Sequence, residues 1–254
     1  MTYFDLTDRV ALVTGASSGL GAHFARTLAA DGASVALMAR RADRLAALAE
    51  EISAAGGTAV PVACDVTDAA DLPRALDAIE GKLGVIDILI NNAGLAGEHG
   101  FLGAPAEETA RVFEVNQAAV WNVAQHVCQR LCAAEQGGTV VNIASIAGLR
   151  AVGGAASYAV SKAAVAHMTR IQALELARHG IRVNAIAPGY FETELTQDFL
   201  ASEAGARLRK RIPMQRIGRL EELDGLLLLL VSDRGSFITG AVIPVDGGHL
   251  LASL

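Results

Sequence analysis

Short apolar segments recur along the chain, and most of them are separated by enough residues to form a helix. These segments are rich in valine, isoleucine and leucine and do not alternate strictly between apolar and polar residues, so we expect strands that are covered on both faces. The seven predicted strands are Arg9–Thr14, Ser34–Ala39, Thr58–Ala63, Val85–Ile90, Gly138–Ala144, Ile181–Ala187 and Ile238–Val245.

Helical patterns follow several of these strands and end at glycine residues. Three of them stop at Gly32, at Gly56–Gly57 and at His179–Gly180. Glycine just beyond the last helical turn supplies the left-handed cap that ends a helix. Strands and helices that alternate through right-handed crossovers predict an α/β fold. We expect a single Rossmann-type domain over residues 1–254, with a doubly wound sheet of about seven parallel strands and helices on both faces.

Two segments interrupt this alternation. Residues 188–219 open with Pro-Gly and carry more charged and polar residues than their surroundings, and residues 95–105 form a glycine-containing loop. Both follow the carboxyl ends of predicted strands, where doubly wound sheets bind ligands. Long irregular segments at such positions are often lids or binding loops. We therefore predict a lid insertion over about residues 188–219.

Composition and charge narrow the class of partner. The 254 residues carry a formal net charge of −6, and 52% of them are hydrophobic. Such a chain can bury a substantial core and has no net basic field to attract phosphates, so we expect no nucleic-acid or membrane partner. The longest apolar run, Leu226–Val231, has only six residues, which is too short to span a membrane.

Other residue types point to ordinary roles. Cys64, Cys128 and Cys132 cannot form a paired disulfide framework, which indicates a reducing, cytoplasmic compartment. The six histidines do not cluster with cysteines or carboxylates at metal-ligand spacing, so we predict no metal site. Glu107 and Glu108 are typical of acids in the first turn of a helix, where the helix dipole favours them, and not of a catalytic pair.

A glycine-rich turn connects the first predicted strand with the first predicted helix. In Thr14–Gly21 the glycines are spaced Gly-x-x-x-Gly-x-Gly, which departs from the Gly-x-Gly-x-x-Gly fingerprint, and no Lys-Ser/Thr pair of a P-loop follows. Glycine permits the tight turn and lets backbone N–H groups approach a pyrophosphate at the positive end of the helix. A turn with a purely structural role is the alternative. The predicted dinucleotide contacts in this turn are Gly15, Ser17, Ser18, Gly19, Leu20 and Gly21.

Two arginines stand where many dinucleotide sites carry an acid. Sites for NAD place a carboxylate near the end of the second strand to hold the ribose hydroxyls, whereas this chain has Ala39-Arg40-Arg41. Two cations near a helix start are unfavourable unless an anion offsets them, and a planar guanidinium is well suited to a 2′-phosphate. Arg40 and Arg41 therefore favour NADP(H) over NAD(H), with a solvated surface pair as the alternative.

A tyrosine and a lysine share one face of a predicted helix. Tyr158 and Lys162 are four residues apart, so their side chains lie on the same side. A phenol is a poor acid–base group at neutral pH, but a nearby ammonium favours the phenolate and lowers its pKa. Tyr158 would then donate a proton to a carbonyl oxygen, or accept one in the reverse direction. Ser145 ends a predicted strand at the carboxyl edge, where its hydroxyl can bind a substrate oxygen; an ordinary turn serine and a structural Tyr–Lys pair are the alternatives.

The set of these motifs and their order along the chain resemble those of the classical short-chain dehydrogenase/reductase family, and within it those of the 3-oxoacyl-acyl-carrier-protein reductases. The resemblance extends from about Asp8 to His249. It implies adenine binding by Asp65-Val66, sheet stability and cofactor lining by Asn91–Gly94, and closure over the nicotinamide by Pro188–Thr193. The further cofactor contacts that it implies are Asp65, Val66, Asn92, Ala93, Gly94, Tyr158, Lys162, Pro188, Gly189, Phe191 and Thr193.

The resemblance also implies a catalytic tetrad of Asn116, Ser145, Tyr158 and Lys162. In this scheme Tyr158 carries the proton, and Lys162 tunes it and binds the nicotinamide ribose. Ser145 orients the substrate oxygen, and Asn116 holds a water in a proton relay. The chain would transfer a hydride between NADP(H) and a carbonyl or secondary alcohol. The alternatives are a non-catalytic dinucleotide-binding sensor or scaffold, an NAD-dependent sugar or polyol dehydrogenase, and an enoyl reductase or epimerase; the Tyr-to-Lys spacing with Ser145 present favours carbonyl chemistry.

Apolar residues around the predicted site favour a small-molecule ketone or alcohol substrate with a largely hydrophobic body. The predicted pocket wall comprises Leu95, Ile146, Leu149, Val152, Tyr190, Phe191, Leu195 and Phe199. The predicted helices over residues 117–134 and 158–178 are apolar around much of their circumference, so part of each needs a partner. They predict a homo-oligomer, and the resemblance implies a tetramer built on these two helices, with a dimer as the smaller alternative.

Overall fold

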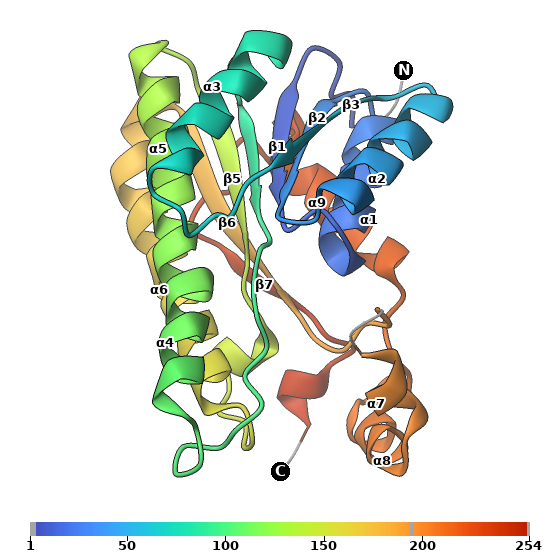
Figure 1. Ribbon diagram of the computed structural model, residues 1–254. Coiled ribbons are helices and arrows are strands. Elements are labelled where there is room, and N and C mark those ends of the chain that lie inside the picture. The colour runs from blue at the N-terminus through green and yellow to red at the C-terminus, as the bar shows by residue number, and fades with distance from the viewer. Residues whose placement is uncertain (1–3, 194–195, 253–254) are drawn as a thin grey trace.

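Within residues 4–193 and 196–252, which the computed structural model describes, seven parallel strands form one sheet (Figure 1). They lie in the order β3-β2-β1-β4-β5-β6-β7. The strands are β1 (Val10–Thr14), β2 (Ser34–Ala39), β3 (Thr58–Ala63), β4 (Ile88–Asn91), β5 (Gly138–Ile143), β6 (Ile181–Pro188) and β7 (Val242–Val245). The predicted doubly wound sheet is confirmed, and its order reverses between β1 and β4, which is where such sheets bind ligands.

Two strands begin at least three residues later than their apolar runs predict. β4 begins at Ile88 and not at Val85, because Asp87 caps the start of the neighbouring strand: its Oδ1 accepts a hydrogen bond from the N–H of Val10 at 2.9 Å. β7 begins at Val242 and not at Ile238, because Gly240 has a positive φ of 76° that turns the chain before the strand.

Helices cover both faces of the sheet (Figure 1). One face packs against α1 (Gly19–Ala30), α2 (Ala42–Ala54) and α9 (Asp224–Val231), and the other against α3 (Asp71–Leu83), α5 (Val120–Ala133) and α6 (Ala156–Leu176). Successive side chains of a strand pack alternately into the hydrophobic cores on the two faces of the sheet. In β1, Ala11 and Val13 face α1, whereas Leu12 faces the opposite helices. The near-continuous apolar strands of the sequence follow from this double cover.

A π-helical turn, Glu114–Ala119, joins α4 (Ala106–Phe113) to α5. Such a turn accommodates one residue more than a regular α-helical turn and occurs frequently at functional sites. Asn116, one of the predicted catalytic residues, lies within it and is fully buried. The predicted helix that begins near Gln117 therefore starts inside an irregular turn, which the apolar periodicity does not indicate.

The predicted lid follows the carboxyl end of β6. It contains two short helices, α7 (Gln197–Ala201) and α8 (Glu203–Arg211), which project from the sheet at the same end of the molecule as the loop before α4 (Figure 1). An isolated parallel bridge between Phe191 and Gly218 ties the start of this segment to its end. The predicted wall residue Leu195 lies outside the described residues, and so does the side chain of Phe199.

Candidate active site

The glycine-rich turn packs tightly against the carboxyl end of β4. Gly15 and Gly19 have positive φ angles of 67° and 54°, which disfavour residues with a side chain. A Cβ atom on Gly15 would lie 2.9 Å from both Nδ2 of Asn92 and Cα of Ala93. On Gly21 a Cβ atom would clash with the carbonyl oxygen of Gly15. The turn therefore requires glycine at these positions, and its shape fits the close approach of a pyrophosphate to the start of α1.

Thr14 ties the two strands at which the sheet order reverses. Its Oγ1 accepts hydrogen bonds from the backbone N–H groups of Asn92 at 3.0 Å and Ala93 at 3.1 Å. In return, Nδ2 of Asn92 donates to the carbonyl oxygens of Thr14 at 3.0 Å and Gly15 at 3.3 Å. Asn92 and Ala93, two of the predicted cofactor contacts, thus lie against the glycine turn. Thr14 is not among the predicted contacts, and its position at the last residue of β1 is the sequence signal that points to it.

Of the two predicted arginines, Arg41 lies beside the turn and Arg40 lies beside Asp65. The Arg41 guanidinium spans its two serines, since Nη2 donates to Ser17 Oγ and to Ser18 Oγ, each at 2.8 Å. The Arg40 guanidinium is 62% exposed and lies 3.9 Å from Oδ2 of Asp65. One cation and two hydroxyls therefore meet at the edge of the turn, and a second cation lies beside Asp65. This set fits a phosphate monoester, whose oxygens accept hydrogen bonds from guanidinium and hydroxyl groups.

Asp65 follows β3 and stands between two guanidinium groups. Its Oδ1 accepts hydrogen bonds from the N–H and the hydroxyl of Thr67 at 3.0 and 2.8 Å, and its Oδ2 lies 3.4 Å from Nη2 of Arg111. Partial burial opposes ionisation, but the hydrogen bonds from Thr67 and the charges of Arg111 and Arg40 together lower the pKa of Asp65. Asp65 is therefore a carboxylate at neutral pH. Arg111, on α4, is a neighbour that no sequence spacing indicates.

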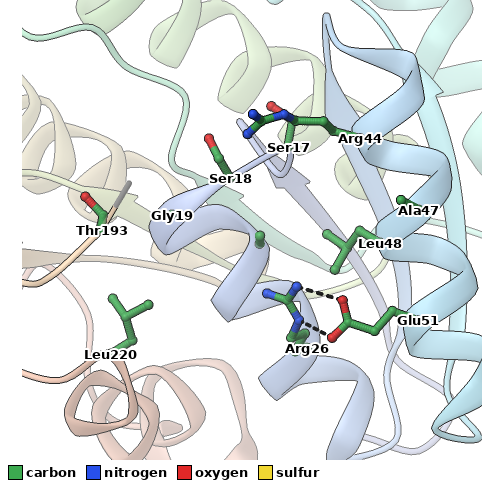
Figure 2. Close-up of a pocket in the computed structure, with 11 residues that line it drawn as sticks. Ser17, Ser18, Gly19, Arg26, Arg44, Ala47, Leu48, Glu51, Thr193 and Leu220 are labelled. Atoms are coloured by element: carbon green, nitrogen blue, oxygen red, sulfur yellow. Dashed lines mark hydrogen bonds and ion pairs between the residues drawn. The ribbon is translucent and has the colours of Figure 1, made fainter. Parts of the chain in front are cut away.

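A hollow of about 410 Å³ adjoins the turn between α1 and α2 (Figure 2). Ser17, Ser18 and Gly19 line its upper part, and Thr193 reaches it from the segment after β6. A Cβ atom on Gly19 would lie 3.7 Å from Cγ2 of Thr193. The structure thus brings the predicted contact Thr193 to the predicted turn. The lower part is bounded by the exposed faces of the two helices, where Arg26 and Glu51 form the bidentate ion pair drawn in Figure 2.

Ser145 and Tyr158 meet at the carboxyl end of β5. Ser145 caps the short 3-10 turn Ile146–Gly148, because its Oγ accepts a hydrogen bond from the N–H of Ala147 at 3.1 Å. Tyr158 lies in the first turn of α6, is half-buried, and shares a side-chain hydrogen bond with Ser145. Burial raises the pKa of Tyr158, the hydrogen bond to Ser145 opposes that rise, and the phenol of Tyr190 adds to it.

Lys162 is buried one helical turn after Tyr158. Its Nζ donates a hydrogen bond to the carbonyl oxygen of Ile143 at 2.7 Å and lies 5.8 Å from the centroid of the Tyr158 ring. Burial lowers the pKa of Lys162 to about 8. The expectation that this ammonium keeps the pKa of Tyr158 below its ordinary value is wrong for the chain alone. Desolvation is the largest influence on the pKa of the phenol, and at Lys162 it disfavours the charged form.

The Asn116 side chain holds two elements together. Its Oδ1 accepts a hydrogen bond from the N–H of Leu95 at 2.8 Å, and its Nδ2 donates to Leu95 O at 2.9 Å and to Ser161 Oγ at 3.0 Å. A Cβ atom on Gly94 would lie 3.4 Å from Asn116 Oδ1 and 3.5 Å from Lys162 Nζ. The predicted residues Gly94, Asn116 and Lys162 therefore come together, and Asn116 joins the π-helical turn to α6.

The segment after β6 completes this edge of the sheet. Pro188 ends β6, and the N–H of Gly189 donates to the carbonyl oxygen of Val245 at 2.8 Å. Phe191 is buried, and the ring of Tyr190 lies 5.7 Å from that of His249. Of the other predicted wall residues, Ile146 is buried and Leu95 is half-buried, whereas Leu149 and Val152 are each 37% exposed.

His249 is a further residue of this region that the sequence does not single out. It is 8% exposed, and its Nδ1 finds no hydrogen-bond partner among the described residues. Burial, with the charge of Arg150, lowers the pKa of His249. Across residues 4–193 and 196–252, no cluster of three histidine, cysteine, aspartate or glutamate residues is placed to hold a metal ion. In the same ranges, no helix has the length and apolar character needed to cross a membrane.

Comparison with known proteins places this arrangement among oxidoreductases. A family model described as Enoyl-(Acyl carrier protein) reductase matches residues 15–249. The chain is 37% identical to the 3-oxoacyl-(acyl-carrier-protein) reductase FabG of Thermotoga maritima, over 97% of this chain and 99% of that protein. A short-chain type dehydrogenase/reductase from Mycobacterium marinum superposes with a TM-score of 0.92 at 41% identity and covers 97% of each chain. A gluconate 5-dehydrogenase from Burkholderia cenocepacia, solved in complex with NADP and tartrate, superposes with a TM-score of 0.94 at 36% identity and covers 98% of each chain.

Proposed function

Since the chain belongs to the short-chain dehydrogenase/reductase family and is an oxidoreductase, we propose that it reduces a ketone with NADPH and oxidises the corresponding secondary alcohol with NADP. The observation that carries this proposal is the convergence of Ser145, Tyr158 and Lys162 beside Gly94, at the same edge of the sheet as the glycine turn. A sensor or scaffold on the same fold has no need of this set.

The residues around the turn support a dinucleotide with a 2′-phosphate. Backbone N–H groups of Gly19, Leu20 and Gly21 at the start of α1 would bind the pyrophosphate. Arg40 and Arg41 would bind the 2′-phosphate together with the serine hydroxyls that Arg41 already contacts. The adenine would lie near Asp65 and Val66, and the nicotinamide near Asn92–Gly94, Pro188-Gly189 and Phe191–Thr193.

The proton chemistry is assigned to the residues of this chain. When bound, NADPH supplies the hydride that reduces the carbonyl carbon. The phenol of Tyr158, whose pKa is raised by burial, is protonated at neutral pH. It would donate this proton to the carbonyl oxygen as the general acid. Ser145, hydrogen-bonded to the same phenol, orients that oxygen. Lys162 holds its ammonium near the ring and has N–H groups left, beside its bond to Ile143, to bind the nicotinamide ribose.

In the reverse direction the phenolate must form, and here the tetrad has a second role. The ammonium of Lys162 and the positive charge of an oxidised nicotinamide both favour the phenolate, and so lower the pKa of Tyr158 from its raised value. Asn116, whose side chain binds Leu95 and Ser161, is assigned by the family resemblance to hold a water in the proton relay.

The apolar residues around the site support a substrate with a hydrophobic body. Ile146 and Phe191 are buried there, Leu149 and Val152 are exposed on the loop after β5, and the loop after β4 exposes Phe101 and Leu102. One observation favours a second candidate, a sugar-acid substrate: the similarity to a gluconate 5-dehydrogenase solved with tartrate. A panel of aryl ketones, 3-oxoacyl thioesters, keto sugar acids and enoyl thioesters, assayed by NADPH oxidation, separates these classes from one another.

The decisive variant is Tyr158→Phe, which removes only the hydroxyl. General acid catalysis contributes about 100- to 10,000-fold, so we expect turnover of the best ketone to fall by at least about 100-fold. NADPH affinity, measured by nucleotide fluorescence, is expected to change by less than about twofold, because the ring remains. A purified Tyr158→Phe protein that keeps its turnover contradicts the assignment. A wild-type protein that binds NADPH but reduces no ketone favours the sensor or scaffold.

We also propose a homo-oligomer, a tetramer or a dimer, in the cytoplasm. On α5 and α6 the large apolar residues Trp121, Val160 and Leu174 are exposed by 44%, 56% and 79%. The two helices lie side by side on the outside of the sheet (Figure 1), so their outer faces form one surface that a second copy can cover. Sedimentation of the protein as a monomer at micromolar concentration contradicts this proposal.

A further inference from the structure

Residues 95–99, which we call the 95–99 segment, lie in the loop that connects the carboxyl end of β4 with α4. We propose that Glu108 of α4 is a positioning residue for the proposed reaction, because its carboxylate holds the 95–99 segment against the helical turn that carries Tyr158. The kinetic part of this inference rests on the proposed function. Its structural part concerns the chain alone.

Glu108 binds one end of the segment through both carboxylate oxygens. Its Oε1 accepts a hydrogen bond from the backbone N–H of Glu98 at 3.2 Å, and its Oε2 lies 2.6 Å from Nδ1 of His99. The Glu108 side chain is only 23% exposed, whereas its neighbour Glu107 is exposed on the same first turn of α4. Either acid suits the helix dipole, but only Glu108 reaches back to the segment.

The segment in turn touches the start of α6. The carbonyl oxygen of His99 accepts a hydrogen bond at 3.0 Å from the N–H of Ala156, the first residue of that helix. The first N–H groups of a helix have no partner within it, so this bond replaces one that the helix cannot make. A Cβ atom on Gly97 would lie 2.6 Å from Ser157 Oγ and 3.5 Å from Tyr158 Cβ. The middle of the segment is thus in contact with the catalytic turn.

The other end of the segment is held independently. Asn116 binds both the N–H and the carbonyl group of Leu95, at 2.8 and 2.9 Å. The segment is therefore anchored at Leu95 by the π-helical turn and at Glu98–His99 by Glu108, with Tyr158 beside the span between the two anchors. Removal of the Glu108 anchor frees the end that caps α6. A catalytic group that is displaced by about 1 Å can lose about 100-fold in rate, so partial loss of one anchor has a measurable kinetic effect.

The test compares Glu108→Ala and Glu108→Gln with Glu107→Ala, which removes the same charge from the same helical turn. In Glu108→Ala we expect kcat with the best ketone to fall by about tenfold. This is smaller than the loss of about 100-fold for a displacement of about 1 Å, because the anchor at Leu95 remains. The KM for NADPH should stay within about twofold, because the dinucleotide contacts are elsewhere. Glu108→Gln keeps one acceptor oxygen and should be intermediate, and Glu107→Ala should match the wild type. The Gln variant also keeps the test open if the Ala variant folds poorly.

A second readout needs no catalysis. Amide hydrogen exchange, measured for the unliganded protein, should be faster at Glu98, His99 and Ala156 in Glu108→Ala by about five- to tenfold, the scale of one or two lost hydrogen bonds. Glu107→Ala should leave these amides unchanged. Unchanged exchange in Glu108→Ala overturns the structural part, and faster exchange with unchanged kcat overturns the positioning role. If the wild type reduces no ketone, the proposed function fails, and the exchange measurement still decides whether Glu108 holds the segment.

Discussion

Removal of the guanidinium groups of Arg40 and Arg41 should abolish the proposed preference for NADPH. The proposed perturbation is the double variant Arg40→Ala/Arg41→Ala, with each single variant alongside. Arg40 is 62% exposed and Arg41 is exposed as well, so their phosphate contacts are screened by water. Exposed ion pairs contribute about 1 kcal/mol at most, and two of them give roughly 2 kcal/mol. Since about 1.4 kcal/mol corresponds to tenfold, we expect the KM for NADPH to rise by about 30-fold.

The same variant should affect NADH much less. NADH has no 2′-phosphate, and Arg41 contacts only the hydroxyls of Ser17 and Ser18 on the turn. We expect the KM for NADH to change by less than about threefold, the scale of one exposed contact. Because exposed charges are screened by salt, the advantage of NADPH in the wild type should shrink between about 0.05 and 0.5 M salt.

The assay is the initial rate of ketone reduction with each coenzyme at two salt concentrations. Arg74→Ala is the matched control, because Arg74 is an arginine on α3 with a 75% exposed side chain, paired with Asp71. It removes one positive charge at a distance from the turn and should leave both KM values unchanged. A wild type that uses NADH as well as NADPH, or a double variant that keeps its preference for NADPH, refutes the assignment of the two arginines.

Two further predictions follow from the packing and burial around the proposed catalytic residues. In Gly148→Ala the added Cβ would clash with the backbone of α6 at Lys162. Because overpacking costs roughly 1–3 kcal/mol, we expect the Tm measured by thermal denaturation to fall by about 3–10 °C. The control variant Gly153→Ala adds a Cβ that meets nothing within 4 Å, and its Tm should match that of the wild type. In the folded chain burial lowers the pKa of Lys162 from 10.5 to about 8. Between pH 8 and pH 10.5 the unfolded chain therefore binds more protons than the folded chain, and the free energy of unfolding increases with pH. Urea denaturation gives the free energy of unfolding of the wild type and of Lys162→Met. From pH 8 to pH 10 the free energy of unfolding of the wild type should increase relative to that of the variant. A difference between the two free energies that does not vary with pH contradicts the burial of the ammonium.

The sequence is sufficient to predict the architecture because double cover of a parallel sheet leaves a strong pattern. Strands such as β1 and β2 are mostly apolar, since their apolar residues face one core or the other in alternation. The errors occur where a single interaction ends a strand. Asp87 caps Val10 and Gly240 turns the chain, and neither event changes the apolar character of the residues nearby.

The candidate site is predictable only where its residues lie in local motifs. Gly15–Gly21, Ser145 and the Tyr158–Lys162 pair stand at strand ends or on one helix face, and the structure brings them to one edge of the sheet. Arg111 and Glu108 act on Asp65 and His99 across the space between separate elements, so spacing along the chain carries no signal of them. The sequence does not predict the direction of the Tyr158 pKa shift either, because this direction depends on how deeply the fold buries the phenol.

The π-helical turn before α5 fixes the rotational phase between two helices. Val112 is buried before the turn, and Val120 and Val123 are buried after it. Deletion of one residue from Glu114–Ala119 would make a continuous α-helix and rotate its two halves by about 100° relative to each other. The shortened helix could bury one half or the other, but not both. Homologous sequences that keep this fold should therefore place their insertions and deletions in loops such as residues 100–104, and not between Phe113 and Val120.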